Sequence, residues 1–545
     1  MTRKTGSTEG QDIGRRDTLK LGLTAAAAAT LAGAGSSRAS RAQSDNILHC
    51  AWSANSVRTL DPHYMRQGAD AWTNRQVHNC LVDPPLGTFD INLPSLRGEL
   101  AESWDLSDDS LVWTLNLRQG VPWHRGYGEV TADDVVFSYQ RMADPASRYS
   151  VALRNMAEVR ATDTHQVQFT LTSPDPTFHA IALISPMYIM SRAAVEDLGD
   201  EGIAMNPVGS GPFKFEGIDT DRGVILSAND DYFDGRPAID GIENRYMPDT
   251  AARTLAFVNG DLDMIDGARQ PGWVQQMQAQ APDATINATA PGSLVTLAFN
   301  MTRPPFDNVL VRKAIRYAID RNVFIDAFGP MCTNVWGINP TQFDGSIQQQ
   351  DLSEELQYNV DLERSRALLA EAGYPDGLQF DAFVSQREDY QSIMLLIQEM
   401  LRQANIEMNL DIIDHTAFHN ERRADRGMLM PFSKTYPPVN TQILFEQFSS
   451  GEISREDSSG GVNHSHYGEA IPGIDARLAE IAVEPDLARR NEMVRQAELQ
   501  ILQDMPSFTL TTMSLITLLG PRVDLGFTIE AGYPQYTLGY ARLLS

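Results

Sequence analysis

The chain has 545 residues, of which 44 are Lys or Arg and 71 are Asp or Glu, so its formal net charge is −27. This length corresponds to roughly two to four domains. Apolar residues make up 42% and charged residues 21% of the chain, which is typical of globular rather than disordered proteins. The acidity argues against binding to nucleic acid or to anionic lipid, because both need an excess of Lys and Arg.

The first 42 residues predict an export signal. Arg15 and Arg16 precede an uncharged, Ala-rich run over 21–34, and a small-x-Ala cleavage pattern ends at Ala42. The apolar run is too short to span a bilayer, which needs about 20 residues. The paired arginines resemble a twin-arginine signal, but Thr18 stands where an aromatic residue is usual, so the general secretory route remains open. We therefore expect a soluble protein in the periplasm.

Three cysteines are too few for a disulfide scaffold. Cys50, Cys80 and Cys332 allow at most one internal disulfide, and the sequence alone does not choose the pair.

The first strongly patterned region predicts a mixed α+β unit. Apolar and polar residues alternate over 111–117 and again over 167–171, as in half-buried strands. Between them, Thr131 stands three residues before Asp134, which indicates the capped start of a helix reaching about Met142.

The second region alternates helices and strands. A helical face covers 311–319, and a helix over 362–372 ends before Gly373. Strands are predicted at 378–384 and 406–412, with a helical stripe over 393–401 between them. This order predicts a right-handed βαβ unit with parallel strands.

Ligands of open α/β sheets bind at the carboxyl ends of the strands. The loop 385–390, which ends with Tyr390, follows the first strand of the βαβ unit. We therefore expect this loop at the mouth of a binding site. The Ser- and Gly-rich stretch 449–465 is predicted to be an exposed loop.

Eight segments spread through the chain resemble the large extracytoplasmic solute-binding proteins of peptide-type ABC transporters, solute-binding family 5, which includes dipeptide, oligopeptide and nickel binders. In chain order they are TLDPH (59–63), LAESW (100–104), WTLNLRQGVPWH (113–124), TADDVVFS (131–138), PVGSGPF (207–213), NDDYFDG (229–235), YAIDR (317–321) and LLAEAGY (368–374).

The resemblance implies an α/β, two-lobed periplasmic binding protein fold, of type II-like topology and the large peptide-binder class. The first lobe would comprise 43–295 and 507–545, with an inserted mixed α+β subdomain at about 88–204. The second lobe would comprise 296–506. Two crossovers near 295 and 506 would form the hinge, and the lobes would close around a ligand.

Arg387 is the strongest candidate ligand-binding residue. It lies in the loop where the dipeptide-binding members of the resembled family carry an arginine that meets the ligand's carboxylate. A guanidinium fork matches a carboxylate and stays charged when buried. The alternative is a surface arginine paired with Glu388 or Asp389.

The stretch around Lys434 and Thr435 departs from the resembled family. In that family it usually carries an aspartate that anchors the ligand's α-ammonium, whereas 431–438 contains no carboxylate and Thr435 is the nearest match. Burying an ammonium without a counter-charge is costly. A ligand without an amino group, or an anionic one that meets Lys434 and Arg387, is therefore favoured, unless another carboxylate reaches this spot.

Trp336 and Tyr436 are candidate apolar walls for the ligand, with a role in the core as the alternative. Neither a cofactor nor a metal is predicted. The pair His464 and His466, which stands in the Ser/Gly-rich loop, is interpreted as exposed rather than as a metal site.

Together these features predict a non-catalytic, monomeric periplasmic receptor that captures a peptide or related small solute and presents it to the transmembrane subunits of an ABC permease. An exported hydrolase and a periplasmic ligand sensor remain the alternatives, although no nucleophile, base and orienting group are recognisable as a set.

Overall fold

The computed structural model describes residues 46–88, 90–455, 461–531 and 535–544. The predicted signal residues Arg15, Arg16 and Ala42 lie outside the described residues. Among the helices described, none has the length and apolarity needed to cross a membrane.

The largest sheet in the described part of the chain has nine strands. Its order is β16 (Leu429–Thr435), β12 (Thr285–Phe299), β17 (Ser507–Leu519), β11 (Met264–Asp266), β1 (Ile47–Trp52), β10 (Gly241–Tyr246), β9 (Gly223–Ala228) and β8 (Phe213–Asp219), with β13 (Cys332–Asn334) paired to β17. β1 and β11 are parallel, whereas β12 pairs antiparallel with both β16 and β17.

A four-stranded antiparallel sheet lies within the predicted insertion. Its order is β4 (Ala101–Leu106), β5 (Val112–Leu117), β7 (Gln166–Leu171) and β6 (Met156–Asp163). The short strands β2 (Val82–Asp83) and β3 (Arg97–Gly98) pair beside it. The helices of this half of the chain are α2 (Gly68–Val77), α3 (Ala132–Met142), α4 (Arg192–Met205), α5 (Thr250–Val258) and α6 (Trp273–Gln280).

The remaining elements follow β12 in the chain. The helices are α7 (Val309–Ala318), α8 (Asn322–Phe328), α9 (Glu354–Gln357), α10 (Leu362–Glu371), α11 (Glu388–Gln403), α12 (His415–Arg423), α13 (Asn440–Phe448), α14 (Tyr467–Ala470), α15 (Ile474–Val483) and α16 (Leu487–Asp504). The strands are β14 (Leu378–Ser385), β15 (Ile406–Ile413), β18 (Val523–Asp524) and β19 (Arg542–Leu543). Single-turn helices occupy Leu93–Ser95, His124–Gly126, Ser150–Leu153, His179–Leu183, Gly329–Met331, Gln349–Asp351 and Ser450–Glu452.

The local predictions are confirmed. Thr131 and Asp134 form a capping box at the start of α3, so two otherwise unpaired backbone N–H groups are satisfied. β14, α11 and β15 form the predicted strand–helix–strand unit, and the two strands are parallel. Residues on the β14–α11 connection line a cavity, as described below.

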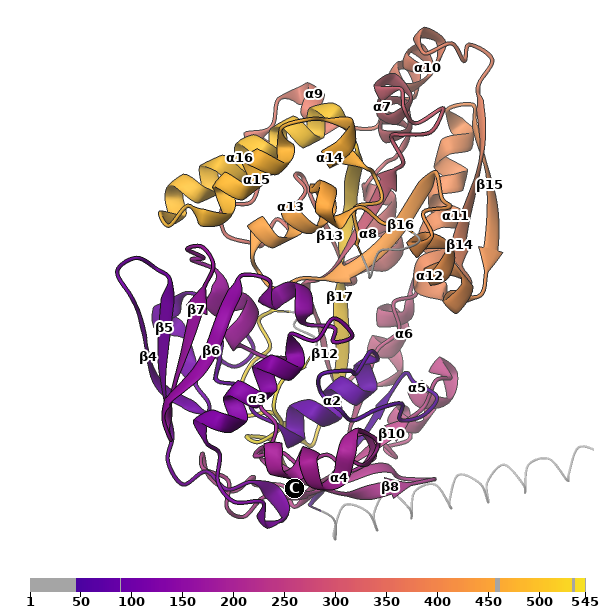
Figure 1. The fold of residues 1–545 in the computed structure, drawn as a ribbon. Helices are drawn as coiled ribbons and strands as arrows, with labels where there is room; N and C mark the ends of the chain where they lie inside the picture. The colour runs from indigo at the N-terminus through magenta and orange to yellow at the C-terminus, as the bar shows by residue number, and fades with distance from the viewer. Residues whose placement is uncertain (1–45, 89, 456–460, 532–534, 545) are drawn as a thin grey trace, which may run out of the picture. The chain divides into compact units, whose positions relative to one another are not determined.

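Two long strands connect the halves of the chain. β12 and β17 pair over most of their length (Figure 1), and the crossovers predicted near 295 and 506 fall on or beside them. Their pairing shifts register between Thr289 and Ser293. There Gly292 has φ +63°, and a Cβ at this position would lie 2.1 Å from the carbonyl oxygen of Met513. The close approach of the two strands therefore requires glycine.

The lobes are named by the predicted boundaries: the first lobe is 43–295 with 507–545, and the second is 296–506. These boundaries remain predictions. One hydrophobic cluster contains Ile265 and Trp273 of the first lobe as well as Val311 and Phe380 of the second. The base of the two lobes is thus packed together, and a separate core supports the four-stranded sheet.

The structure decides two expectations from the sequence, one about the cysteines and one about the stretch 449–465. Cys50, Cys80 and Cys332 all lie in the described part of the chain, and each is a buried free thiol. The expectation of an exposed loop over 449–465 is wrong for its described residues 463–465, which are buried. His464 and the adjacent His466 are 1% and 7% exposed, because the His464 ring packs edge-on against Phe432 of β16 at 5.5 Å and His466 lies 3.1 Å from Asp425.

Candidate functional site

The candidate site is a cleft between the two lobes, made of two cavities. Cavity A has a volume of about 700 Å³ and is lined by Trp52 and Arg269 from the first lobe and by Arg387 from the second. Cavity B has a volume of about 840 Å³ and is lined by Arg66 from the first lobe and Lys434 from the second. Such volumes are typical of sites for small ligands.

The two cavities are adjacent. Gly68, at the start of α2, and Gln535 line both of them. A small hollow lined by Arg269, Tyr390 and Ser433 lies beside them. We call cavity A, cavity B and this hollow together the cleft.

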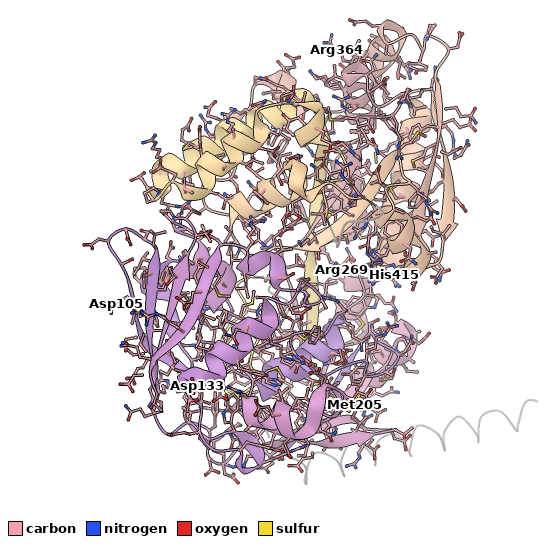
Figure 2. The ribbon with its side chains drawn as sticks, in the orientation of Figure 1. Asp105, Asp133, Met205, Arg269, Arg364 and His415 are labelled. Carbon is pink, nitrogen blue, oxygen red and sulfur yellow. The ribbon has the colours of Figure 1, made fainter. Side chains whose placement is uncertain are left out.

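Arg269 is a candidate anion-binding residue of the cleft. It lies on the short loop between β11 and α6 and lines both cavity A and the small hollow (Figure 2). Among the described residues it has no ion-pair or hydrogen-bond partner. Burial lowers the pKa of its guanidinium and Arg387 lowers it further, whereas Asp389, Tyr390 and Asp266 raise it in part. An unneutralised, half-buried guanidinium is a ready partner for an anion.

The loop that carries Arg269 is fixed by the sheet. The Gly267 N–H donates to the carbonyl of Ile516 in β17 at 2.9 Å. A Cβ at position 267 would lie 2.5 Å from the Ile516 side chain and 2.7 Å from that of Trp273. Only glycine therefore allows this approach, which orients the chain toward the cleft two residues before Arg269.

Arg387 lies where the sequence predicted, at the mouth of cavity A, but it is already paired. Its Nε and Nη2 donate to the two carboxylate oxygens of Asp389 at 3.1 and 2.8 Å. Its side chain remains 55% exposed. Arg387 also precedes α11 as its N-terminal flanking residue, so Asp389 stands in the first helical turn, where a carboxylate is favoured by the helix dipole.

Tyr390 is the aromatic residue of this part of the cleft. It lines the small hollow with Arg269 and Asp389, and its ring packs edge-on against Phe418 of α12 at 5.4 Å. Burial raises the pKa of its phenol, and Asp389 raises it further. The hydroxyl therefore remains a neutral hydrogen-bond donor.

Lys434, Thr435 and Tyr436 all line cavity B at the end of β16. The Lys434 ammonium pairs with Glu446 of α13 and lies 4.8 Å from the centre of the Tyr436 ring. The Thr435 hydroxyl lies 3.0 Å from that of Ser293 in β12. Tyr436 is only 2% exposed, so this ring contributes to the core as well as to the cavity wall.

Trp336 is placed apart from the other candidates. It is not among the residues that line cavity A, cavity B or the small hollow. It packs against the core around α16, and the Arg321 guanidinium lies 4.6 Å from its ring centre. The structure thus brings together five of the six predicted site residues and leaves Trp336 outside.

The cleft carries more positive than negative side chains, although the protein as a whole is acidic. The basic lining residues are Arg66, Arg148, Arg253, Arg269, Arg387, Arg423 and Lys434, and the acidic ones are Asp266, Glu388, Asp389, Glu446 and Glu452. Asp266 pairs with Arg253 at 2.8 Å, and Glu388 accepts a hydrogen bond from Gln270. The carboxylates are thus engaged by their neighbours, which leaves a net positive cleft.

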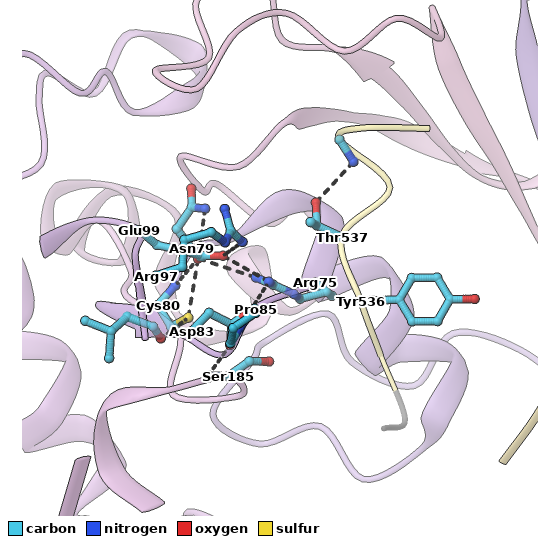
Figure 3. A network of polar contacts seen from close by, with 12 residues as sticks. Arg75, Asn79, Cys80, Asp83, Pro85, Arg97, Glu99, Ser185, Tyr536 and Thr537 are labelled. Atoms are coloured by element: carbon cyan, nitrogen blue, oxygen red, sulfur yellow. Dashed lines mark hydrogen bonds and ion pairs between the residues drawn. The ribbon is translucent and has the colours of Figure 1, made fainter. Parts of the chain in front are cut away.

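Behind cavity B, a buried polar network fixes α2. Arg75 donates to Glu99 at 2.9 Å and to Asp83, and the Asn79 amide donates to Glu99 at 3.1 Å (Figure 3). Asp83 in turn accepts the backbone N–H of Ser185 at 3.3 Å, and Ser185 lines cavity B. The network therefore holds part of the cavity wall in place.

Part of this network has the composition of a metal site. Among the described residues, Cys80, Asp83 and Glu99 form the one group of three potential ligands that lie close together. Arg75 already neutralises both carboxylates, and burial raises the pKa of the Cys80 thiol well above its usual value. A protonated thiol and paired carboxylates do not favour a cation, so we interpret the group as structural.

One serine–histidine contact has the spacing of a nucleophile and its base. The Ser385 hydroxyl lies 2.8 Å from Nδ1 of His415. Ser385 is completely buried, and its hydroxyl also accepts the backbone N–H of Arg387 at 3.1 Å. It therefore caps the β14–α11 turn and is not accessible to a substrate, which removes the contact as a candidate hydrolytic site.

The comparison with family models identifies the chain. Residues 95–450 match the model of the bacterial extracellular solute-binding proteins, family 5 middle region. The chain belongs to this family.

Curated relatives agree with this assignment. The family-5 chain is 30% identical over 346 residues to heme-binding protein A of Haemophilus influenzae, a match that covers 57% of this chain and 59% of that protein. It is 29% identical over 393 residues to the dipeptide-binding protein of Escherichia coli, covering 67% and 68% of the two chains.

A solved structure extends the similarity to nearly the whole family-5 chain. The protein MoaA from A. tumefaciens R10, solved in complex with mannopinic acid, matches with a TM-score of 0.80 and 29% identity, over 92% of this chain and 100% of that one. The two-lobed binding-protein fold predicted from the sequence is thus confirmed.

Sequence reasoning missed Arg269. The signal available was weak: an arginine in a Gly- and Pro-containing turn after the short apolar strand Met264–Asp266. Nothing local indicates that this turn faces Arg387, because the two positions are 118 residues apart in the chain and meet only across the cleft.

Proposed function

We propose that this protein is the periplasmic substrate-binding component of an ABC importer that takes up an acidic organic solute. The solute is bound between the two lobes through a carboxylate, released unaltered and passed to the transmembrane permease. We further propose that it is not an ordinary peptide with a free amino terminus.

The observation that carries the proposal is the unpaired guanidinium of Arg269. In the same cleft, Asp389 engages Arg387 and Glu446 engages Lys434. The two cations expected from the sequence to meet the ligand are therefore neutralised within the protein. Arg269 lies where cavity A meets the small hollow, so a carboxylate there would gain a charge-assisted pair of hydrogen bonds.

The surroundings support an acid in this position. Tyr390 provides a neutral phenol beside Arg269, and Arg387 is close enough to lower the pKa of the Arg269 guanidinium. A net positive cleft in a chain of net charge −27 also focuses the attraction for anions on the binding site. Thr435 and Tyr436 would then line the more distant part of the ligand.

The relatives are compatible with this ligand class. MoaA was solved with mannopinic acid, and this chain resembles it over nearly its full length. The dipeptide-binding protein of E. coli is similar over about two thirds of the chain, so the family contains more than one ligand class. The unpaired Arg269 favours the acid.

A thermal-shift panel tests the proposal on the purified protein. The panel contains mono- and dicarboxylic acids, free dipeptides and neutral sugars. Acids are expected to raise the unfolding temperature, because a ligand at a hundredfold excess over its Kd adds about 2.7 kcal/mol to stability. Stabilisation by neutral sugars or free peptides alone would contradict the proposal.

Single-residue variants test whether Arg269 itself binds the acid. Arg269→Ala is expected to weaken acid binding by about 10- to 100-fold, the loss typical of a charge-assisted hydrogen bond. Arg269→Lys should retain part of the affinity. Arg495→Ala, an exposed arginine on α16, is the matched control and should bind as the wild type does. Mass spectrometry of the recovered ligand separates a receptor, which returns it intact, from a hydrolase.

A further inference from the structure

Lys434 sits in a pocket with the chemistry of an ammonium-binding site. Its ammonium pairs with the carboxylate of Glu446, whose side chain is 7% exposed, and it lies 4.8 Å from the centre of the Tyr436 ring. A buried carboxylate beside an aromatic face is the combination that recognises alkylammonium groups.

The pocket is built independently of Lys434. Glu446 accepts a hydrogen bond from the Gln442 amide at 2.9 Å, which fixes the carboxylate on α13. Glu452 adds a second carboxylate to the wall of cavity B. Burial raises the pKa of Glu452, and the nearby Glu446 raises it further. Glu452 is paired with Arg154 at 3.6 Å, so Glu446 is the carboxylate that pairs with the Lys434 ammonium.

We propose that Lys434 fills an ammonium subsite of the ligand cleft with its own side chain and thereby excludes ligands that carry a free amino group. The proposal rests on the proposed function in one respect, namely that cavity B belongs to the ligand cleft. It makes Lys434 a specificity-determining residue, with Glu446 and Tyr436 as the walls of the subsite.

Ligands with a free amino group are excluded because they must compete with the lysine ammonium for Glu446. A ligand ammonium that enters the pocket must displace the lysine ammonium from Glu446, so one ion pair is lost for each one formed. The lysine is tethered, and its effective concentration at the pocket is therefore of millimolar order. A ligand without an amino group leaves the Lys434–Glu446 pair intact and incurs no such loss.

Chemical rescue tests the subsite directly. Lys434→Ala removes the ammonium that pairs directly with Glu446 and opens space for a small amine. We expect 50 mM n-butylammonium chloride to raise the unfolding temperature of this variant by about 2 °C over the same concentration of potassium chloride. No such difference is expected in the wild type, in Lys434→Ala/Glu446→Gln, or in the control Lys313→Ala on α7.

A matched pair of ligands tests the specificity. Alanyl-alanine and N-acetyl-alanyl-alanine both carry the carboxylate for Arg269 and differ at the amino group. Lys434→Met, which keeps the side-chain length, should shift the ratio of the two affinities at least tenfold toward the free dipeptide. This variant also covers the case in which Lys434→Ala does not fold.

Three results would overturn the inference: butylammonium no better than potassium in folded Lys434→Ala, an unchanged ratio of the two affinities in Lys434→Met, or a wild type that already prefers the free dipeptide. Failure of the proposed function is a different result. That result is the absence of acid binding together with no effect of Arg269→Ala. If butylammonium still stabilises Lys434→Ala in that case, the ammonium subsite is supported and the acidic ligand is not.

Discussion

Arg387 and Asp389 form a bidentate ion pair at the start of α11, with N–O distances of 3.1 and 2.8 Å. The arginine that the sequence marks as the ligand's partner is therefore held by its own chain. With this pair and the Lys434–Glu446 pair formed, Arg269 remains a half-buried cation of cavity A that has no ion pair among the described residues.

Removing the carboxylate of this pair should strengthen the binding of acids. Asp389→Asn frees Arg387 and removes a negative charge close to Arg269, so we expect an increase in affinity of about threefold for a carboxylate ligand. Isothermal titration with the best acid from the panel measures it. Unchanged or weaker binding would show that Arg387 does not reach the ligand.

Three buried histidines should make the first lobe acid-sensitive. Burial lowers the pKa of His63 and of His124 to about 4 and that of His78 to about 3. The unfolded chain binds these protons near pH 6.5, whereas the folded protein does not. Their contribution to stability is therefore complete above pH 6.5 and is lost as the pH falls toward 4, by about 3 kcal/mol for each residue at most.

His78 provides the sharpest version of this experiment, because both of its ring nitrogens are buried without a hydrogen-bond partner among the described residues. Denaturant titrations between pH 4 and pH 7 are expected to show a shallower loss of stability for His78→Leu than for the wild type. Equal slopes for the two proteins would rule out His78 as a source of the acid sensitivity.

The Arg75 network should be critical for stability. Arg75→Met removes the ion-pair partner of buried Asp83 and leaves Glu99 with Arg97 alone, at 3.5 Å, and we expect a loss of about 3–5 kcal/mol in the free energy of unfolding. Urea denaturation at neutral pH measures it. The exposed pair of Arg402 and Glu399 on α11 supplies the control, since Arg402→Ala should cost no more than about 0.5 kcal/mol.

The predicted export signal lies outside the described part of the chain. Replacing Arg15 and Arg16 with lysine is expected to hold the precursor in the cytoplasm, because the twin-arginine route reads the guanidinium pair. Cell fractionation and immunoblotting follow the precursor and the mature form. Normal export of the double variant would indicate the general secretory route.

Much of the local structure follows from the sequence because its causes are local. The Thr131–Asp134 capping box sets the start of α3, and Gly373, with φ +97°, follows the end of α10. Alternating apolar residues place β5 and β7 in one sheet. The ordered family segments then indicate two lobes, since they carry the pattern of a whole chain rather than of one element.

What the sequence by itself determined is thus the elements, the family and the region of the cleft formed by 385–390 and 434–436. Only the tertiary structure decided the charge state of that cleft. Lys434 is neutralised by Glu446, twelve residues away on another element, and Arg269 is brought to the cleft by the pairing of β11 with β17. The Arg387–Asp389 pair joins neighbours and is one of the alternatives predicted from the sequence, whereas the position of Arg269 beside the 385–390 loop depends on contacts between residues remote in the chain, which no local pattern encodes.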